Sequence, residues 1–390
     1  MARLIVKRGR AKPLWYGHPW VYAQAVERVE GSYEPGGVVD VIDPSGAFIG
    51  RALANPRSSI VARILSRDPN EHIDRELLRR RLAAALAVRA RLGLPGQGTD
   101  AYRLVNSEGD GLPGLVVDVY GKSLAVQFTA LGLYRLADAI VTLLRELLEP
   151  ERIVQIGAGA YAQTEGIPAT THLLHGEGGE VVVSENGVRY GVDLLGGQKT
   201  GLYCDQRLNR ALVASLSRGQ RVLDCYSYVG GFALNALHGG ALEVTAVDAS
   251  GRAVAAAQRN AELNGVALPV VEADVFRYLA EVPRGSVDLT IVDPPKFARS
   301  RRELDAALKG HRKLHRAALR TVRDGGLLAS ACCSQLVTVD ELRRTLAAAA
   351  LDERRRVRLL QVLGAGPDHP TLPGFPEGEY LKFLLCEVTS

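Results

Sequence analysis

From about residue 196 onward, the sequence alternates between short apolar stretches and longer amphipathic stretches. The short apolar stretches predict strands at residues 221–225, 243–247, 269–272, 287–292 and 326–331. The longer stretches predict helices at residues 231–239, 250–264, 275–281, 303–323 and 339–350. Because a helix follows each strand, this part of the chain is expected to form an open, doubly wound parallel sheet of the α/β class.

The C-terminal end departs from this alternation. Residues 357–362 and 380–388 have the pattern of strands, but the link between them is rich in Gly and Pro and has no helical pattern. Because parallel neighbours usually need a crossover helix, these two strands are predicted to form an antiparallel hairpin at the edge of the sheet. Such an edge is typical of class I S-adenosylmethionine (SAM)-dependent methyltransferases, with their Rossmann-like sheet, rather than of nicotinamide enzymes.

Three acidic residues follow three successive predicted strands. Asp224 precedes a glycine turn in which Gly230 and Gly231 allow a ligand to approach closely, and its carboxylate suits an ammonium group better than a pyrophosphate. Asp248 is placed to bind ribose hydroxyls and Asp274 to bind an adenine amine. Each acid alone could instead cap a helix. Together these segments predict a SAM site at Asp224, Tyr226, Tyr228, Gly230, Phe232, Asp248, Asp274 and Val275.

Two further motifs follow the next two predicted strands, at the carboxyl ends of these neighbours in the sheet. The first is residues 293–297 (Asp-Pro-Pro-Lys-Phe) and the second is residues 332–334 (Cys-Cys-Ser). An Asp-Pro-Pro shelf could hold an exocyclic amine, or it could steady a pyrimidine ring while a cysteine adds to carbon 6 and activates carbon 5. The second interpretation makes Asp293 and Cys333 catalytic, with substrate contacts from Pro294, Pro295, Lys296 and Phe297. A cysteine that only packs is the alternative.

The N-terminal part combines basic and aromatic residues. Residues 1–95 contain 16 Lys and Arg against 9 Asp and Glu, whereas the whole chain has a net charge of +5. Residues 1–70 contain short predicted strands at 21–26, 38–43, 47–53 and 60–65, separated by turns, which indicates a small barrel. Trp15, His18 and Trp20 could bind RNA by stacking on bases, or they could form an aromatic core. A basic helix over residues 299–323 could also hold an RNA backbone.

Residues 71–195 predict a middle domain of the α+β type. Helices are expected at 71–93 and 133–148, strands at 102–105, 115–119, 124–128 and 152–156, and a hairpin at 181–194 around Asn186-Gly187. The predicted organisation is therefore a barrel at 1–70, a middle domain at 71–195 and a SAM-dependent methyltransferase domain at 196–390.

Several segments spread along the whole chain resemble one known family. They are residues 17–22 (Gly-His-Pro-Trp-Val-Tyr), 106–114 (Asn-Ser-Glu-Gly-Asp-Gly-Leu-Pro-Gly), 198–207 (Gln-Lys-Thr-Gly-Leu-Tyr-Cys-Asp-Gln-Arg), 293–297, and Asp-His-Pro at 368–370 before Glu-Tyr-Leu-Lys at 379–382. On these motifs the chain resembles the RlmI-type large-subunit ribosomal RNA methyltransferases, which form 5-methylcytosine. The resemblance implies an N-terminal PUA barrel, SAM as the cofactor and 23S ribosomal RNA as the partner. It leaves the oligomeric state open, with a homodimer as one option.

The resemblance also implies roles for particular residues. Thr200, Gln206 and Arg207 would border the cofactor pocket, together with Lys199. The Ser-Cys-Ser signature of the family aligns with residues 332–334, which makes Cys333 the nucleophile and Cys332 a departure. Many other RNA cytosine methyltransferases carry a second cysteine where this chain has Pro295, so the base that removes the carbon-5 proton is unassigned.

Composition limits the remaining possibilities. No run of 18 apolar residues occurs and the start does not read as a signal peptide, so we expect a cytoplasmic protein with no membrane partner. The five cysteines include no C-x-x-C pair, so neither a disulfide framework nor a metal site is expected. Two alternatives to a cytosine-C5 methyltransferase stay open. One is an RNA methyltransferase that acts on an exocyclic amine, and the other is a non-catalytic RNA-binding assembly factor.

Overall fold

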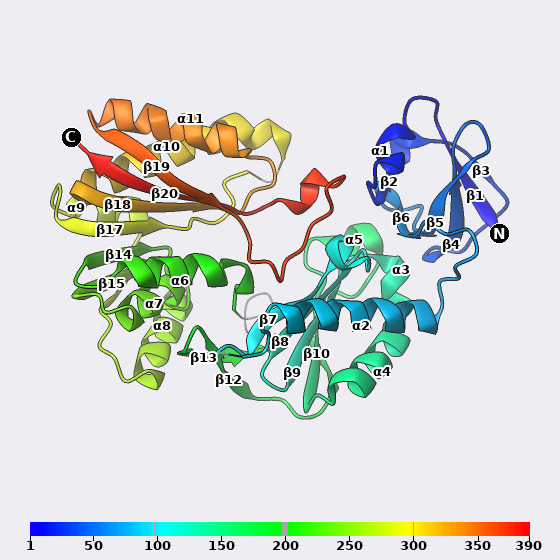
Figure 1. Ribbon diagram of the computed structural model, residues 1–390, viewed down its shortest axis with the longest axis horizontal. Coiled ribbons are helices and arrows are strands. Elements are labelled where there is room, and N and C mark those ends of the chain that lie inside the picture. The colour runs from blue at the N-terminus through cyan, green and yellow to red at the C-terminus, as the bar shows by residue number, and fades with distance from the viewer. Residues whose placement is uncertain (97, 197–201, 299) are drawn as a thin grey trace. The chain divides into compact units, whose positions relative to one another are not determined.

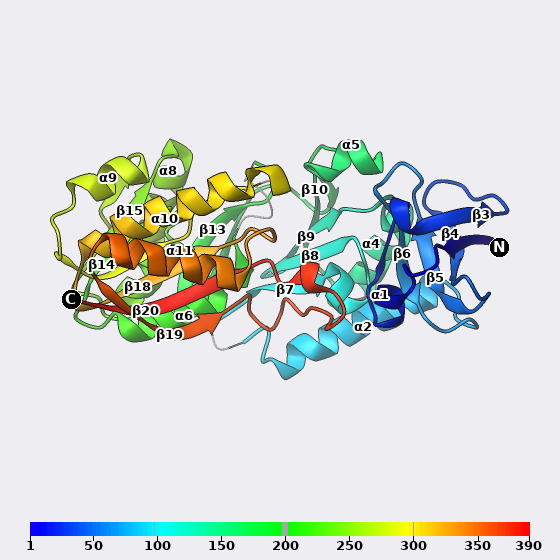
Figure 2. The same cartoon turned by 90° about the horizontal axis from the view of Figure 1, so that it is seen from above.

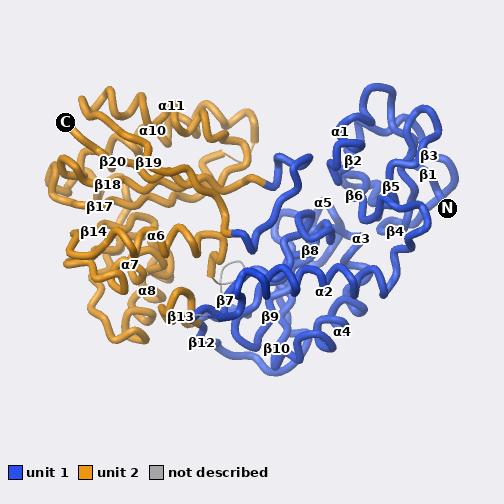
Figure 3. The backbone as a smooth tube through the Cα atoms, viewed as in Figure 1, with its two compact units in different colours: residues 1–183, 192–201, 367–378 blue, residues 184–191, 202–366, 379–390 orange. Residues whose placement is uncertain are grey.

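The computed structural model describes residues 1–96, 98–196, 202–298 and 300–390. The chain divides into two compact units, shown in Figure 3: unit 1 comprises residues 1–183, 192–201 and 367–378, and unit 2 comprises 184–191, 202–366 and 379–390. The chain passes between these units more than once. The division into three domains with boundaries after residues 70 and 195 stays a prediction.

Unit 1 begins with a small β domain. Its strands are β1 (Ala2–Val6), β2 (Trp20–Tyr22), β3 (Val26–Glu30), β4 (Gly37–Ile42), β5 (Phe48–Ala54) and β6 (Ile60–Ser66), in the order β2-β6-β5-β4-β1-β3. β1 pairs with β4 in parallel and the other pairs are antiparallel. The single strand predicted at 21–26 is wrong in detail, because a turn of 3-10 helix, η1 (Ala23–Ala25), separates β2 from β3. The sequence interpretation also missed β1 and the short helix α1 (Lys12–Trp15).

The rest of unit 1 is a second sheet covered by helices. Its strands are β7 (Ala101–Asn106), β8 (Leu115–Tyr120), β9 (Ser123–Phe128), β10 (Arg152–Ile156) and β11 (His172–His175), in the order β11-β10-β9-β8-β7. Helices α2 (Arg75–Arg91) and α4 (Ala137–Leu148) run alongside this sheet in Figure 1 and bury leucines in one apolar core with it. Leu53 and Leu65 of the small β domain join the same core. The shorter elements are η2 (Ser107–Asp110), α3 (Leu131–Tyr134), α5 (Tyr161–Glu165) and the hairpin β12 (Glu180–Glu185) with β13 (Val188–Asp193).

Unit 1 also contains a segment from near the C-terminus, residues 367–378, which ends in η5 (Pro376–Gly378). The buried Asp368 accepts a hydrogen bond from the backbone N–H of Arg103 at 3.1 Å, and its own carbonyl accepts one from the Arg89 guanidinium at 2.6 Å. Asn106 donates to the Pro370 carbonyl at 2.9 Å. These bonds join residues 368–370 to the rest of unit 1.

Unit 2 contains the predicted open sheet. Its strands are β14 (Arg221–Cys225), β15 (Glu243–Asp248), β16 (Val270–Glu272), β17 (Val287–Val292), β18 (Val322–Cys332), β19 (Arg356–Leu363) and β20 (Lys382–Thr389), in the order β16-β15-β14-β17-β18-β20-β19. The pairs from β16 to β18 are parallel, and β20 is antiparallel to both β18 and β19. The predicted C-terminal hairpin is confirmed. The reversed strand, β20, lies one place inside the edge, and β19 forms the edge itself.

Helices cover both faces of this sheet. Helices α9 (Val275–Glu281), α10 (Leu304–Thr321) and α11 (Val339–Asp352) pack on one face. Helices α6 (Arg207–Leu216) and α7 (Gly231–His238) pack on the other, and α8 (Gly251–Leu263) contacts β15 and β16. Figures 1 and 2 both show α10 and α11 side by side. The strand order reverses between β14 and β17, so the carboxyl ends of these two strands mark the expected ligand site.

Candidate active site

Asp224 is the last-but-one residue of β14 and is fully buried. Its Oδ2 accepts a hydrogen bond from the backbone N–H of Ala233 at 2.9 Å, whereas its Oδ1 has no hydrogen-bond partner among the described residues. Burial is the main cause that raises the pKa of this carboxyl to about 8, with smaller contributions from Asp293 and Asp248, while the Ala233 hydrogen bond and Arg210 act in the opposite direction. A buried carboxyl with one unsatisfied oxygen fits the ammonium group of SAM, which would supply the missing donor and the compensating charge.

The loop after β14 has a constrained backbone. Tyr226 and Tyr228 have φ angles of 63° and 50°, and Gly230 has a φ of 80°. Bulky residues rarely adopt positive φ, and such conformations concentrate in ligand-binding loops where the surrounding structure holds them. One of those restraints is visible, because the Tyr228 N–H donates to Oδ2 of Asp248, at the end of β15, at 2.9 Å. The loop therefore has the fixed shape that a cofactor site needs.

The other predicted cofactor residues are in place at the strand ends, but some of their groups are already engaged. Oδ1 of Asp248 accepts from the Ser250 N–H at 2.9 Å, and Asp274 caps α9 by accepting from the Arg277 N–H at 3.0 Å. Phe232 is buried and stacks on Phe383, with ring centroids 6.0 Å apart. Val275 is also buried. Since these two side chains belong to the core, a cofactor contact by either residue would use its backbone, and the assignment stays a prediction.

A buried ion pair between Arg210 and Glu185 lies next to the predicted cofactor loop. The Arg210 guanidinium donates to Glu185 at 2.6 Å and to the Tyr203 carbonyl at 2.8 Å. A Cβ added to Gly231, at the start of α7, would lie 2.8 Å from Nε of Arg210, so the arginine packs directly under the glycine turn. The sequence interpretation missed Arg210 and Glu185, because no local pattern links positions that meet only in the folded chain.

Gln206 lies at the end of η3 (Cys204–Gln206) and is buried. Its side-chain amide donates to Oδ2 of Asp293 at 3.0 Å. Asn209 fixes that amide by donating to Oε1 of Gln206 at 2.6 Å, and it also donates to the Gly364 carbonyl at 3.2 Å. The resemblance placed Gln206 at the cofactor, whereas the structure shows its amide on the predicted catalytic carboxylate.

The neighbouring residues of this motif are only partly described. Arg207 is buried at the start of α6, and its carbonyl accepts from Asn186 at 3.0 Å. Lys199 and Thr200 lie outside the described residues. The cofactor roles of Thr200 and Arg207 therefore stay predictions.

The two vicinal cysteines differ in environment. Cys332 ends β18, is only 2% exposed, and has its Sγ 3.5 Å from Nε2 of His311 on α10. Burial raises the pKa of the Cys332 thiol. Cys333, one residue beyond the strand, is half-buried. Of the two sulfurs, only that of Cys333 lies in a position partly open to a substrate.

Cys333 and Asp293 follow adjacent strands and share a neighbour. Burial raises the pKa of the Tyr203 hydroxyl, and the charges of Asp205, Cys333 and Asp293 raise it further. Tyr203 therefore lies close enough to both predicted catalytic groups to interact with each. Its ring also packs against that of Tyr228, with centroids 5.3 Å apart. The sequence interpretation did not single out Tyr203, although it lies inside the motif at 198–207.

The rest of the Asp-Pro-Pro-Lys-Phe shelf divides into buried and open parts. Pro294 is buried, while Pro295 and Lys296 are exposed. Phe297 is half-buried and its ring packs against His311, with centroids 4.8 Å apart. Pro295 and Lys296 are thus available for a substrate, and the contacts predicted for Pro294 and Phe297 are constrained by packing.

The predicted RNA contacts of the N-terminal domain also differ in accessibility. Trp15 is 49% exposed. Trp20 donates its indole N–H to Glu108 at 2.7 Å and packs edge-to-face on Phe375, and His18 is buried within 3.3 Å of Glu377. The polar groups of His18 and Trp20 therefore already have partners inside unit 1. Their role in RNA binding stays a prediction, with Trp15 the most accessible of the three.

Two arginines of the basic helix of the sequence interpretation form ion pairs within unit 2. Arg312 pairs with Asp352 at 2.7 Å, and Arg316 pairs with Glu353 at 3.2 Å. Arg320 donates to the Ala280 carbonyl at 2.5 Å. The middle and end of α10 therefore have less free positive charge for a nucleic acid than the sequence suggested.

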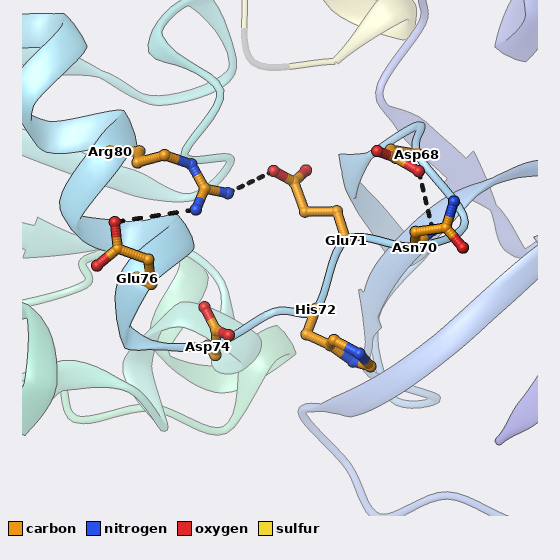
Figure 4. Close-up of a pocket in the computed structure, with 7 residues that line it drawn as sticks. All are labelled: Asp68, Asn70, Glu71, His72, Asp74, Glu76 and Arg80. Atoms are coloured by element: carbon orange, nitrogen blue, oxygen red, sulfur yellow. Dashed lines mark hydrogen bonds and ion pairs between the residues drawn. The ribbon is translucent and has the colours of Figure 1, made fainter.

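A separate hollow of about 330 Å³ lies in unit 1, near the start of α2 (Figure 4). Arg80 spans part of it and forms ion pairs with Glu71 at 2.6 Å and Glu76 at 3.9 Å. Its lining residues are Asp68, Asn70, Glu71, His72, Asp74, Glu76 and Arg80. Across the part of the chain that the structure describes, no cluster of His, Cys, Asp and Glu could hold a metal ion.

Comparison with known proteins decides the family. Residues 4–67 match the PUA-like domain family, and residues 166–371 match the S-adenosylmethionine-dependent methyltransferase family. The chain is also 37% identical over 395 residues to "Ribosomal RNA large subunit methyltransferase I" of Erwinia tasmaniensis, covering 99% of each protein. The chain belongs to this methyltransferase family. A second relative of the same name, from Alteromonas mediterranea, is 37% identical over 394 residues, or 100% of this chain and 99% of the relative.

Solved structures agree on the fold. A SAM-dependent methyltransferase structure from Streptococcus mutans has a TM-score of 0.85 at 22% identity, covering 99% of this chain and all of the other. A methyltransferase structure complexed with SAH has a TM-score of 0.86 at 23% identity, with the same coverage. These structures confirm the Rossmann-like methyltransferase fold, and the two family matches confirm the PUA-like domain and the SAM cofactor. Among the described helices, none is both long enough and apolar enough to cross a membrane.

Proposed function

We propose that this methyltransferase acts on large-subunit ribosomal RNA, in particular 23S RNA, and forms 5-methylcytosine through a covalent adduct with Cys333. The ribosomal RNA substrate is supported by full-length relatives that are named for it. The observation that carries the cytosine chemistry is the placement of Cys333 and Asp293 after the adjacent strands β18 and β17, where both interact with Tyr203.

The cofactor would be held by the acids at the strand ends of the same sheet. Asp224 offers a buried, unsatisfied oxygen for the ammonium group, Asp248 lies at the end of β15 for the ribose, and Asp274 begins α9 near the adenine position. When bound, SAM supplies an electrophilic methyl group at the end of the sheet where Cys333 and Asp293 lie.

The reaction itself falls to this chain's own groups. The Cys333 thiolate adds to carbon 6 of a cytosine that has left its stack, forming a C–S bond and moving electron density onto carbon 5 and the ring nitrogen. Asp293 steadies the ring at that nitrogen, with its second oxygen held by Gln206. Carbon 5 takes the methyl group as the bond from that methyl to the SAM sulfur breaks, and its proton then passes to a base, which can be a water molecule. The electron pair of that C–H bond restores the double bond and expels the thiolate.

The test compares the two vicinal thiols on the same substrate. Unmodified ribosomal RNA is incubated with SAM and with the wild type, Cys333→Ala or Cys332→Ala, and the methylated nucleoside is located by mass spectrometry. We expect 5-methylcytosine from the wild type and from Cys332→Ala, and none from Cys333→Ala. RNA carrying 5-fluorocytosine, which cannot release a proton from carbon 5, should trap a covalent adduct on the peptide containing Cys333.

Two outcomes contradict the proposal. Full methylation by Cys333→Ala would exclude the covalent route, and a methyl group on an exocyclic nitrogen would favour the amine-methylating alternative. In either case SAM binding should persist, because the cofactor residues lie on other strands.

A further inference from the structure

Lys382 is a buried lysine that no sequence motif assigned to the chemistry. It is the first residue of β20, lies directly opposite Cys332 on β18, and is only 4% exposed. Its ammonium group donates to the Ser334 carbonyl at 2.5 Å and to the Tyr380 carbonyl at 3.0 Å. Lysines are seldom so deeply buried unless their charge is compensated.

No carboxylate within the described residues forms an ion pair with Lys382. Its two hydrogen-bond acceptors are uncharged carbonyls, and an ammonium group has three protons to donate. Burial lowers the pKa of Lys382, and the groups whose negative charge opposes that shift are, in order, Cys332, Cys333 and Glu341 on α11. The two vicinal thiols are therefore its principal potential counter-charges.

The other groups around the thiols do not supply a positive charge in the interior. Burial, and to a smaller extent the charge of Lys382, lowers the pKa of His311 to about 4, so this histidine is neutral at physiological pH. Lys296 also acts on Cys332, but it is exposed and its charge is screened by water. Asp293 and Tyr203 have the opposite effect on the thiols, because a negative charge on either residue disfavours a thiolate. The backbone N–H of Ser334 also favours ionisation of Cys332. Among the described charged groups that favour a thiolate here, Lys382 is the buried one.

We propose that Lys382 is a positioning residue for the nucleophile, in which its buried ammonium group favours the thiolate of Cys333 while its bond to the Ser334 carbonyl holds the turn that presents the sulfur. The inference rests on the proposed role of Cys333. The charge of Lys382 acts on Cys332 as well, but Cys332 is buried in the core, so the accessible thiolate is that of Cys333. Nearby cations lower thiol pKa values by this mechanism in many reactive cysteines.

The experiment measures thiol ionisation without RNA or cofactor. In the full-length protein carrying Cys332→Ser, the rate of alkylation of Cys333 by iodoacetamide is followed against pH, and the modified peptide is identified by mass spectrometry. The variants are Lys382→Met, Lys382→Gln, which keeps a donor without the charge, and Lys382→Arg, which keeps the charge. Lys313→Met, on the exposed face of α10, is the matched control.

We expect the midpoint of alkylation to rise by about one pH unit in Lys382→Met and Lys382→Gln, which is about a tenfold loss of reactivity at pH 7. Lys382→Arg and Lys313→Met should stay near the wild-type midpoint. An unchanged midpoint in Lys382→Gln would overturn the inference, as would an equal rise in Lys382→Arg, since that would indicate a packing effect. If Lys382→Met does not fold, the comparison of Lys382→Gln with Lys382→Arg still decides.

The result is separable from the proposed function. Alkylation reports on the thiol alone, so Lys382 can be shown to act on Cys333 even if Cys333→Ala retains methylation. Conversely, loss of methylation in Cys333→Ala with an unshifted alkylation profile in Lys382→Gln would keep the covalent route and remove Lys382 from it.

Discussion

Binding of SAM is expected to remove a proton from Asp224, and its affinity should therefore depend on pH. Burial raises the pKa of this carboxyl to about 8 in the free protein. The cofactor ammonium needs the ionised form, which at pH 7 is only about one molecule in eleven for a pKa of about 8. Below that pKa each pH unit changes the ionised fraction tenfold, so the dissociation constant should fall about tenfold between pH 6 and pH 7. The sign follows from proton release: affinity rises with pH until the pH approaches about 8, where the ammonium group of free SAM begins to lose its own proton.

Calorimetry can measure both parts of this prediction. Titrating SAM into the protein at pH 6, 6.5 and 7, in buffers of different ionisation enthalpy, gives the affinity and the number of protons released. We expect close to one proton released by the wild type at pH 6.5. Asp224→Asn should bind more weakly and lose both the slope and the proton. Asp248→Asn should weaken binding but keep the slope, because the titrating group remains.

A flat affinity in the wild type over this range, with no proton release, would refute the reasoning. It would mean that Asp224 is already ionised in the free protein, or that the ammonium group is bound elsewhere. A slope that survives in Asp224→Asn would assign the titration to another group.

Two further predictions concern buried polar contacts. Replacing Gln206 by Leu should lower kcat about ten- to a hundredfold with little change in SAM affinity, because it removes a hydrogen bond to the Asp293 carboxylate. A loss of SAM affinity with unchanged kcat would instead assign Gln206 to cofactor binding. Replacing Arg210 by Leu should cost about 3–5 kcal/mol in urea unfolding, because it leaves Glu185 buried without its guanidinium. The exposed Arg316→Ala is the control and should cost less than about 1 kcal/mol, so equal losses would contradict the argument.

The fold of unit 2 was predictable because its signals are local. Each parallel strand contains a short apolar run and is followed by a helical pattern, whereas the last two runs have no such pattern between them, so the central strands and the C-terminal hairpin could be located from the pattern alone. The small β domain was harder. Ala2–Val6 is flanked by basic residues and was not recognised as a strand, and the break at Ala23–Ala25 carries neither Gly nor Pro to mark it. The strand at Ala2–Val6 pairs with β3 and β4, which lie further along the chain, and no local sequence pattern encodes such a pairing.

The residues of the candidate site also differ in whether a local sequence feature reveals them. Acids at strand ends could be located because a strand end is a local feature, and the topology then brings neighbouring ends together. The contact of Gln206 with Asp293 joins residues 87 apart in the sequence, and Lys382 reaches Ser334 from 48 residues away. Such pairs depend on the packed arrangement of strands and helices. The side chains that tune the reactive groups are therefore those that the sequence could not reveal.

Strand geometry also distinguishes the environments of the vicinal thiols. Successive side chains of a strand point to opposite faces, and Cys332 points toward α10, where its sulfur meets His311. A sulfur in that position behaves as a small core side chain, so a serine there should change packing but not chemistry. Cys333 directly follows β18 and is partly exposed, and Asp293 directly follows the neighbouring strand β17. We therefore expect Cys332→Ser, which restores the Ser-Cys-Ser pattern of the resembling family, to keep its rate of methyl transfer within a few-fold of wild type. A loss as large as that of Cys333→Ala would instead make the buried sulfur a participant in the reaction, with His311 as its proton acceptor.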